Sequence, residues 1–235
     1  MVPHKLTLPL SALLVVFIHA NVFAQRKAPS GGRIAVVVDE RLAALRSTPE
    51  LNGKLVRRLG RGRLVAIRSV KIDRNGIAFL YVSVTTRTRG WIQRESVVAP
   101  SRPGDDGRLL SLIQTSHGFD RIVRSRLFLD HFRRSPLRPQ VLLILGNTAE
   151  QLAPQLTQSA TRKLENAGSL EAPEFTYYLN HSGLDRYNRQ GVHFTFDPTT
   201  KRLHYDGSAW RTILRQHAQS PEAPEARQRL LRIKS

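Results

Sequence analysis

The sequence predicts an α+β fold in two parts, a small β-barrel followed by a mostly α-helical domain with one β-hairpin. Over residues 34–99, short apolar runs rich in β-branched residues alternate with turn residues, a pattern typical of a small barrel. Over residues 108–235, the apolar residues recur at intervals of three and four, the spacing of amphipathic helices. The intervening residues 100–107 (PSRPGDDG) break both patterns, and we interpret them as a linker.

The beginning of the chain has the order of a secretory signal peptide. A weakly basic start precedes an apolar run at Leu10–Ile18, and small residues lead to a cleavage position after Ala24. We therefore expect residues 1–24 to be removed and residues 25–33 to form a flexible leader. The apolar run is shorter than the ~20 residues that a membrane-spanning helix needs. The expected product is an exported protein, periplasmic or extracellular, with no transmembrane segment after signal removal.

The chain is strongly basic. Lys and Arg total 37 against 18 Asp and Glu, a formal net charge of +19, and 30 of the 37 are Arg. Arg is suited to bidentate contacts with anions, and such a charge attracts wall polymers, lipid headgroups or nucleic acid. Because the Arg residues are scattered and form no block, a generally basic surface remains the alternative interpretation. No zinc-finger or RNA-recognition signature is present, so nucleic acid is not the expected partner.

The strands expected in the first part are separated by glycines and by Asn75-Gly76, which favour turns. The apolar runs are residues 34–38, 55–59, 64–70, 77–84, 89–92 and 96–99. A segment of this length is sufficient for one small barrel, because domains of about 55–65 residues fold alone.

Several short motifs lie along these runs. They are Ala44-Leu45-Arg46, Gly53-Lys54-Leu55-Val56, Leu59, Gly62, Val65, Arg89-Gly90-Trp91-Ile92 and Val97-Val98. As a set they resemble the bacterial Src-homology-3-like (SH3b-type) family, over about residues 34–99. The resemblance implies an SH3-like barrel that tethers a protein to wall polymers or to partner proteins. One position departs from the family, since Phe79 stands where a Trp is usual, three residues before Val82.

The second part is expected to consist of consecutive helices interrupted by one hairpin. Asp105 and Asp106 can cap the first helix, Gly118 separates it from the second, and Pro136 starts a third. A hairpin near residues 191–206 turns at the Asp-Pro-Thr-Thr sequence. Helices resume at Ser208 and after Pro221.

A weak internal repeat lies in this helical part. Phe128-Leu129-x-x-Phe132-x-x-Ser135-Pro136 parallels Ile213-Leu214-x-x-His217-x-x-Ser220-Pro221, at an offset of 85 residues. A helix, Ser-Pro and a new helix resemble the junction between tetratricopeptide units. The offset is not a multiple of the 34-residue period. We therefore expect divergent antiparallel helix pairs, only weakly similar to tetratricopeptide-type repeats.

One strand of the barrel presents a candidate ligand-binding face. The alternate residues Ala78, Leu80, Val82 and Val84 are all apolar and are expected to point into the barrel. Phe79 and Tyr81 then point outward, with Trp91 on a following strand as a third aromatic. The arginines Arg46 and Arg89 could hold an anionic group beside them. Two interpretations stay open, a ligand-binding face or a contact that the helical part covers.

A polar and aromatic cluster forms the secondary candidate site: Tyr178, His181, Asp185 and Tyr187. If Gly183 permits a helix, His181 and Asp185 are one helical turn apart and can form a hydrogen bond. Such a pair could act as a general base. No nucleophile at a recognisable spacing accompanies them, so a structural cluster is the alternative, and no catalytic residue is predicted.

The predicted hairpin brings two histidines together, but no metal site is expected there. His193, His204 and Asp206 are of the types that bind metals. Their alternation with apolar neighbours assigns them to the solvent face of a half-buried hairpin instead. The chain has no Cys, which excludes disulfides and thiolate sites. No cofactor is expected.

The function expected from these patterns is non-enzymatic binding or scaffolding in the bacterial cell envelope. The barrel would bind peptidoglycan or another anionic envelope polymer, or an envelope protein. One alternative is an accessory subunit that binds a protein through its helical domain. A second is an enzyme of unrecognised type that uses the region of His181 and Asp185.

Overall fold

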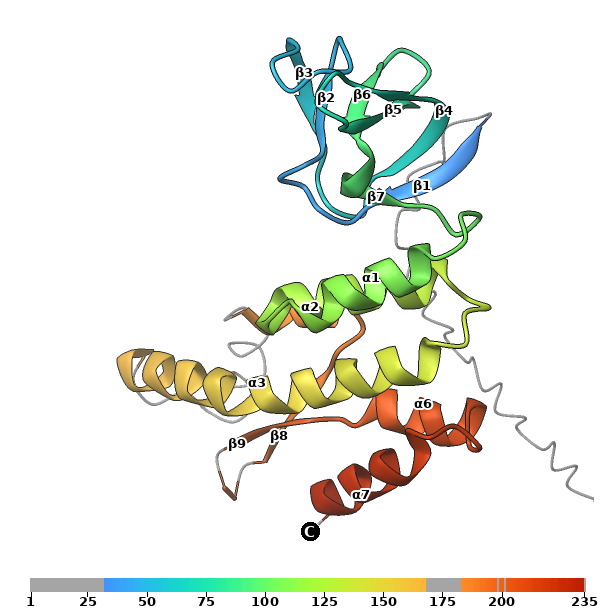
Figure 1. Cartoon of the computed structure of the whole chain (residues 1–235). Coiled ribbons are helices and arrows are strands. Elements are labelled where there is room, and N and C mark those ends of the chain that lie inside the picture. Colours follow the sequence, from blue (N-terminus) through green and yellow to red (C-terminus); the bar gives the residue numbers. More distant parts are fainter. Residues whose placement is uncertain (1–31, 168–182, 198, 201, 235) are drawn as a thin grey trace, which may run out of the picture.

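The computed structural model describes residues 32–167, 183–197, 199–200 and 202–234. It is a mixed α+β structure, in which a seven-stranded antiparallel sheet is followed by helices and a small hairpin (Figure 1). The predicted α+β class is therefore confirmed. The strand order is β3-β2-β6-β5-β4-β1-β7, and the two end strands do not pair with each other in the described part of the chain. Closure into an SH3-like barrel stays a prediction.

The sheet places its apolar residues as the alternation predicted. Its strands are β1 (Arg33–Val37), β2 (Ala44–Arg46), β3 (Leu55–Arg58), β4 (Leu64–Ile72), β5 (Ala78–Ser83), β6 (Arg89–Gln93) and β7 (Val97–Val98). Leu80, Val82 and Val84 lie in a buried cluster with Val65 and Ile92. This cluster is the core of the sheet, and the predicted inward phase of β5 is confirmed for these three residues.

Strand β4 is long and irregular. Its register against β5 shifts between Ile67 and Ser69, which indicates a β-bulge. Beyond the bulge, β4 and β5 continue as a hairpin whose turn is held by Asp73. The Asp73 carboxylate accepts the backbone N–H groups of Asn75 and Ile77, both at 2.8 Å. Gly76 has a φ of +78°, a conformation that favours glycine at this turn.

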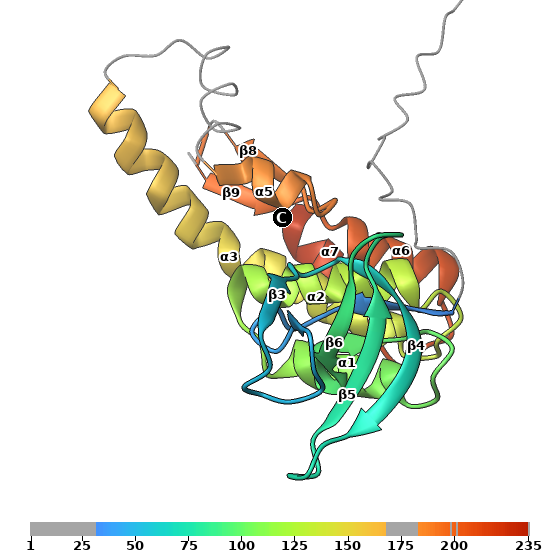
Figure 2. The same cartoon turned by 90° about the horizontal axis from the view of Figure 1, so that it is seen from above.

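The helical part follows the predicted order. Its elements are α1 (Asp105–Gln114), α2 (Gly118–His131), α3 (Arg138–Ala167), α5 (Asp185–Asn188), β8 (Phe194–Asp197), β9 (Arg202–Tyr205), α6 (Ser208–Gln216) and α7 (Ala223–Lys234). Helix α3 runs through Pro154 without ending there. Seen from above, α3 extends well beyond the edge of the sheet (Figure 2). None of the helices in the described ranges is both long and apolar enough to cross a membrane.

The sheet and the helices share one buried cluster. Val36 and Val98, on β1 and β7, lie in the same cluster as Leu109, Ile113 and Phe128 of the first two helices. The layer of α1 and α2 lies directly under these strands (Figure 1). The two parts therefore pack together through β1 and β7, which form one continuous apolar core with the helices.

The segment expected to be a linker is a fixed turn. Asp105 is buried, and its carboxylate accepts the Ala99 N–H at 2.6 Å and Arg102 Nε at 2.8 Å. Arg108 Nε lies 3.4 Å from the same carboxylate. Gly104, with a φ of +80°, precedes helix α1. A largely buried ion pair holds this segment in place, so the description of it as an unattached linker does not fit.

Candidate functional site

The candidate site is a row of side chains across five neighbouring strands of the sheet. Cross-strand pairing joins Leu55 to Arg46, Arg46 to Trp91, Trp91 to Tyr81 and Tyr81 to Ser69. We call these five residues the outer row. Arg46, Trp91 and Tyr81 alternate with the core residues Leu45, Leu80 and Ile92, so these three lie on the face opposite the sheet core.

The two aromatic rings at the centre of the outer row touch. The ring centroids of Tyr81 and Trp91 are 5.1 Å apart, with an angle of 48° between the ring planes. Both side chains are half-buried. Direct cross-strand pairing fixes their relative position, because opposing residues of an antiparallel pair have Cβ atoms about 5 Å apart. The pair forms a rigid, partly accessible apolar surface.

Cationic side chains flank this aromatic pair. Arg46 adjoins Trp91 in the outer row, and its Nη1 donates to the Gly53 carbonyl at 2.8 Å. Arg89 is exposed and lies opposite Ser83, two residue pairs beyond Tyr81 and Trp91. Neither arginine has a carboxylate partner among the described residues. Their charges are therefore free to meet an anion.

The position of Phe79 corrects part of the prediction. It pairs with Lys71 and Gln93 on the same face as Tyr81, but its side chain is completely buried. Phe79 therefore supports the sheet and does not belong to an accessible ligand surface. Alternation gave its face correctly but could not reveal that neighbouring side chains cover it.

The helices pack against a different part of the sheet. Val36, Val38 and Val98 form the apolar contact with the helices. Tyr81 and Trp91 are not members of this shared cluster. In Figure 1 the strands β5 and β6 lie away from the helical layers. Among the described residues, Tyr81 and Trp91 therefore lie outside the apolar contact between the sheet and the helices.

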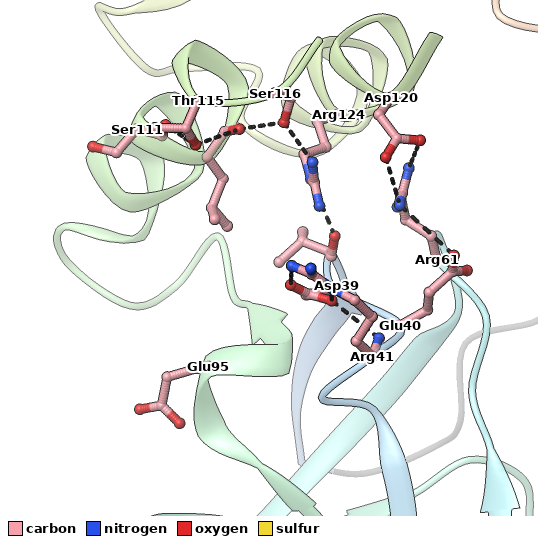
Figure 3. A network of polar contacts seen from close by, with 12 residues as sticks. Asp39, Glu40, Arg41, Arg61, Glu95, Ser111, Thr115, Ser116, Asp120 and Arg124 are labelled. Atoms are coloured by element: carbon pink, nitrogen blue, oxygen red, sulfur yellow. Dashed lines mark hydrogen bonds and ion pairs between the residues drawn. The ribbon is translucent and has the colours of Figure 1, made fainter. Parts of the chain in front are cut away.

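A polar network reinforces this junction between the sheet and the helices (Figure 3). The buried Arg124 of α2 donates to the Val38 carbonyl at 3.4 Å and to the Ser116 hydroxyl. Arg61 pairs with Asp120 at 2.9 Å across the junction. The hydrogen bond from Arg61 lowers the pKa of Asp120, so this carboxylate stays charged. We assign these residues to holding the two parts together.

The secondary candidate cluster is only partly described. Tyr178 and His181 lie outside the described residues. Asp185 is exposed and pairs with Arg189 at 3.1 Å. Tyr187 is buried, and its ring contacts Phe119 with the centroids 5.1 Å apart. Tyr187 is therefore a core residue and not an accessible site residue.

The hairpin directs its polar residues as predicted. Leu203 and Tyr205 are buried, while His193 is exposed and pairs with the Asn188 side chain at 3.2 Å. Asp206 accepts the Ser208 N–H at 2.8 Å at the start of α6. Burial raises the pKa of Tyr205 to about 12. Within the described ranges, no three His, Cys, Asp or Glu side chains are grouped as a metal site.

The sequence interpretation missed two exposed side chains on this part of the sheet. Leu55 is 46% exposed at the end of the outer row, and Lys71 is exposed across from Phe79. Alternation within β4 could have placed Lys71 on this face. The position of Leu55 depends on the bulged register between β2 and β3, which no local pattern predicts.

Comparison with protein-family models, curated proteins and solved structures finds no match to this chain. The resemblances to SH3b-type domains and to tetratricopeptide-type repeats therefore stay predictions from the motifs. The arrangement of the outer row and its charges has to support the function by itself.

Proposed function

We propose that the protein is an exported, non-enzymatic binding protein of the bacterial cell envelope. Its sheet binds an anionic polymer such as peptidoglycan at the outer row, around Tyr81 and Trp91. The observation that supports this most is a half-buried aromatic pair, with ring centroids 5.1 Å apart, beside two arginines that lack carboxylate partners in the described residues.

The residue types suit a polymer with both sugar rings and carboxylates. Aromatic rings provide a flat apolar surface for the face of a sugar, and the Trp N–H and Tyr O–H add hydrogen bonds at the rim. Guanidinium groups hold carboxylates by two parallel hydrogen bonds. Arg46 lies opposite Trp91 on β2, and Arg89 lies two residues from Trp91 on β6, so both are near the rings for such contacts. The net charge of +19 adds long-range attraction to any polyanion.

Removing both rings is expected to weaken polymer binding severely. Buried aromatic contacts at an interface are often worth 2 kcal/mol or more, so the double variant Tyr81→Ala/Trp91→Ala should lose about a hundredfold or more in affinity. Co-sedimentation with isolated peptidoglycan measures this loss. Leu231→Ala, which trims an apolar side chain that is 64% exposed on α7, is the matched control and should bind normally. A folded double variant with unchanged binding would contradict the proposal.

The arginines beside the rings are expected to contribute a salt-sensitive part of the binding. Arg46→Gln/Arg89→Gln should bind more weakly than the wild type and show a shallower decline with added salt, because exposed charges are screened over about 8–10 Å at ordinary ionic strength. Arg215→Gln/Arg227→Gln has the same net charge, with both changes at exposed positions on α6 and α7. Equal effects of the two double variants would show that net charge alone drives binding. The same co-sedimentation assay over a salt series measures both.

A further inference from the structure

The sheet has one open edge at strand β3. This strand ends the strand order and, among the described residues, pairs only with β2. All four of its residues, Leu55–Arg58, are exposed. At the other end of the sheet, β7 is buried, and the side chains of Arg102 and Arg108 donate to its Val97 carbonyl. The two edges therefore differ, and β3 is the accessible one.

Some backbone hydrogen-bonding groups of β3 point outward from this open edge, away from β2. The Leu59 N–H donates to the Ala43 carbonyl at 3.0 Å, toward β2. Along an antiparallel strand, successive residues direct their N–H and C=O groups to opposite sides. The N–H and C=O of Arg58 therefore point away from β2. An incoming extended chain can pair with these groups, as in β-strand addition.

The side chains of β3 specify what kind of chain would fit. Leu55 and Val56 are 46% and 50% exposed, which is unusual for apolar residues at a free edge. Arg57 and Arg58 are exposed and have no carboxylate partner in the described residues. Successive residues of a strand point to opposite faces, so a fitting segment would have two acidic residues in succession, which pair with these arginines, and two apolar residues in succession, which cover Leu55 and Val56.

A second copy of this chain fits the edge poorly. Pairing two β3 strands would bring four arginines together between molecules that each have a net charge of +19. Like charges directly opposite each other on neighbouring strands are destabilising. We propose that β3 accepts an extended, acidic segment of a partner protein as an added strand of the sheet. This edge shares Leu55 with the outer row, but it lies two strands away from Trp91 in the strand order.

The test uses the full chain and a synthetic peptide in which Glu-Glu pairs alternate with Val-Val pairs. NMR hydrogen exchange should show the Arg58 amide slowed by about tenfold or more at saturating peptide, because it gains a partner. The Leu59 amide already donates to Ala43 and is the internal control, with little change expected. A Glu-Pro peptide, with Pro in place of each Val, has the same charge but cannot pair as a strand, and it should bind at least tenfold more weakly.

Two variants separate backbone pairing from charge. Arg58→Pro removes the outward N–H without removing a bond to β2, and it should lose peptide binding while staying folded. Arg57→Gln/Arg58→Gln should weaken binding about tenfold more than Arg215→Gln/Arg227→Gln, which has the same net charge. Trp91→Ala should leave peptide binding intact. Equal binding of the Glu-Pro peptide, or an Arg58 amide unaffected at saturation, would overturn the proposal. Absence of binding by any acidic peptide would also overturn it and would show that the bulge and arginines only protect the edge.

Discussion

Replacing Phe128 by alanine is expected to lower the free energy of unfolding by about 3–5 kcal/mol, and to lower it for the sheet and the helices together. Phe128 is fully buried on α2, and its ring packs against Phe132 with the centroids 5.2 Å apart. It belongs to the cluster that also contains Val36 and Val98 of the sheet. A cavity there weakens packing that both parts of the molecule use.

A variant with one tryptophan can follow the two parts separately. The chain has two Trp residues, Trp91 in the sheet and Trp210 in helix α6. In a Trp210→Phe background, fluorescence reports the sheet through Trp91, and far-UV circular dichroism reports mainly the helices. We expect both signals to show one urea midpoint, and Phe128→Ala to move both midpoints downward by the same amount.

The control for this experiment is Leu231→Ala, an exposed change that should alter stability by no more than about 0.5 kcal/mol. If Phe128→Ala lowers the helical midpoint and leaves the Trp91 midpoint unchanged, the sheet folds independently of the helices. That outcome would contradict the shared core seen at β1 and β7.

The order of elements could be predicted because alternation and helical spacing are local properties. The inward residues Leu80 and Val82 were predicted from a period of two, and the hairpin residues Leu203 and Tyr205 in the same way. Each of these residues is buried in the structure. Local pattern therefore gave the phase of the strands, although it gave neither the register between strands nor what covers each face.

The sequence of β1 contains a pattern that indicates a second layer packed against this strand. Residues 35–38 are four apolar residues in succession. Ala35 and Val37 belong to the sheet core, whereas Val36 and Val38 face the helices. A continuous apolar run is typical of a strand that is buried on both faces. This run could have predicted that a second layer covers β1.

The candidate site was predictable only in its centre. Tyr81 and Trp91 stand out because outward aromatics on a small sheet are unusual, and alternation places them on one face. The burial of Phe79 and the position of Leu55 depend on side chains and registers from distant parts of the chain. Such long-range packing has no local period, so a single sequence carries no local record of it.

Replacing Asp105 by alanine is expected to destabilise the protein by about 3 kcal/mol and to turn the junction into a flexible linker. Its side chain is 6% exposed and faces Arg102 and Arg108, which are 17% and 31% exposed. Removing one partner of a buried ion pair costs about 3–5 kcal/mol, because the remaining charges lose their compensation. The partial exposure of the two arginines favours the lower end of that range. The Ala99 N–H also loses its acceptor.

Urea unfolding measures the stability loss, and limited proteolysis with a protease of broad specificity measures the loosening of the junction. The wild type should resist cleavage between Pro100 and Asp106, because Asp105 ties the turn to β7 and α1. The Asp105→Ala variant should be cut there first, since proteases select segments that open locally. Asp106→Ala is the matched control. That neighbouring carboxylate accepts the Ser135 hydroxyl at 2.8 Å, and losing such a bond should cost only about 1–2 kcal/mol. Equal sensitivity of wild type and Asp105→Ala would mean that this carboxylate does not hold the junction.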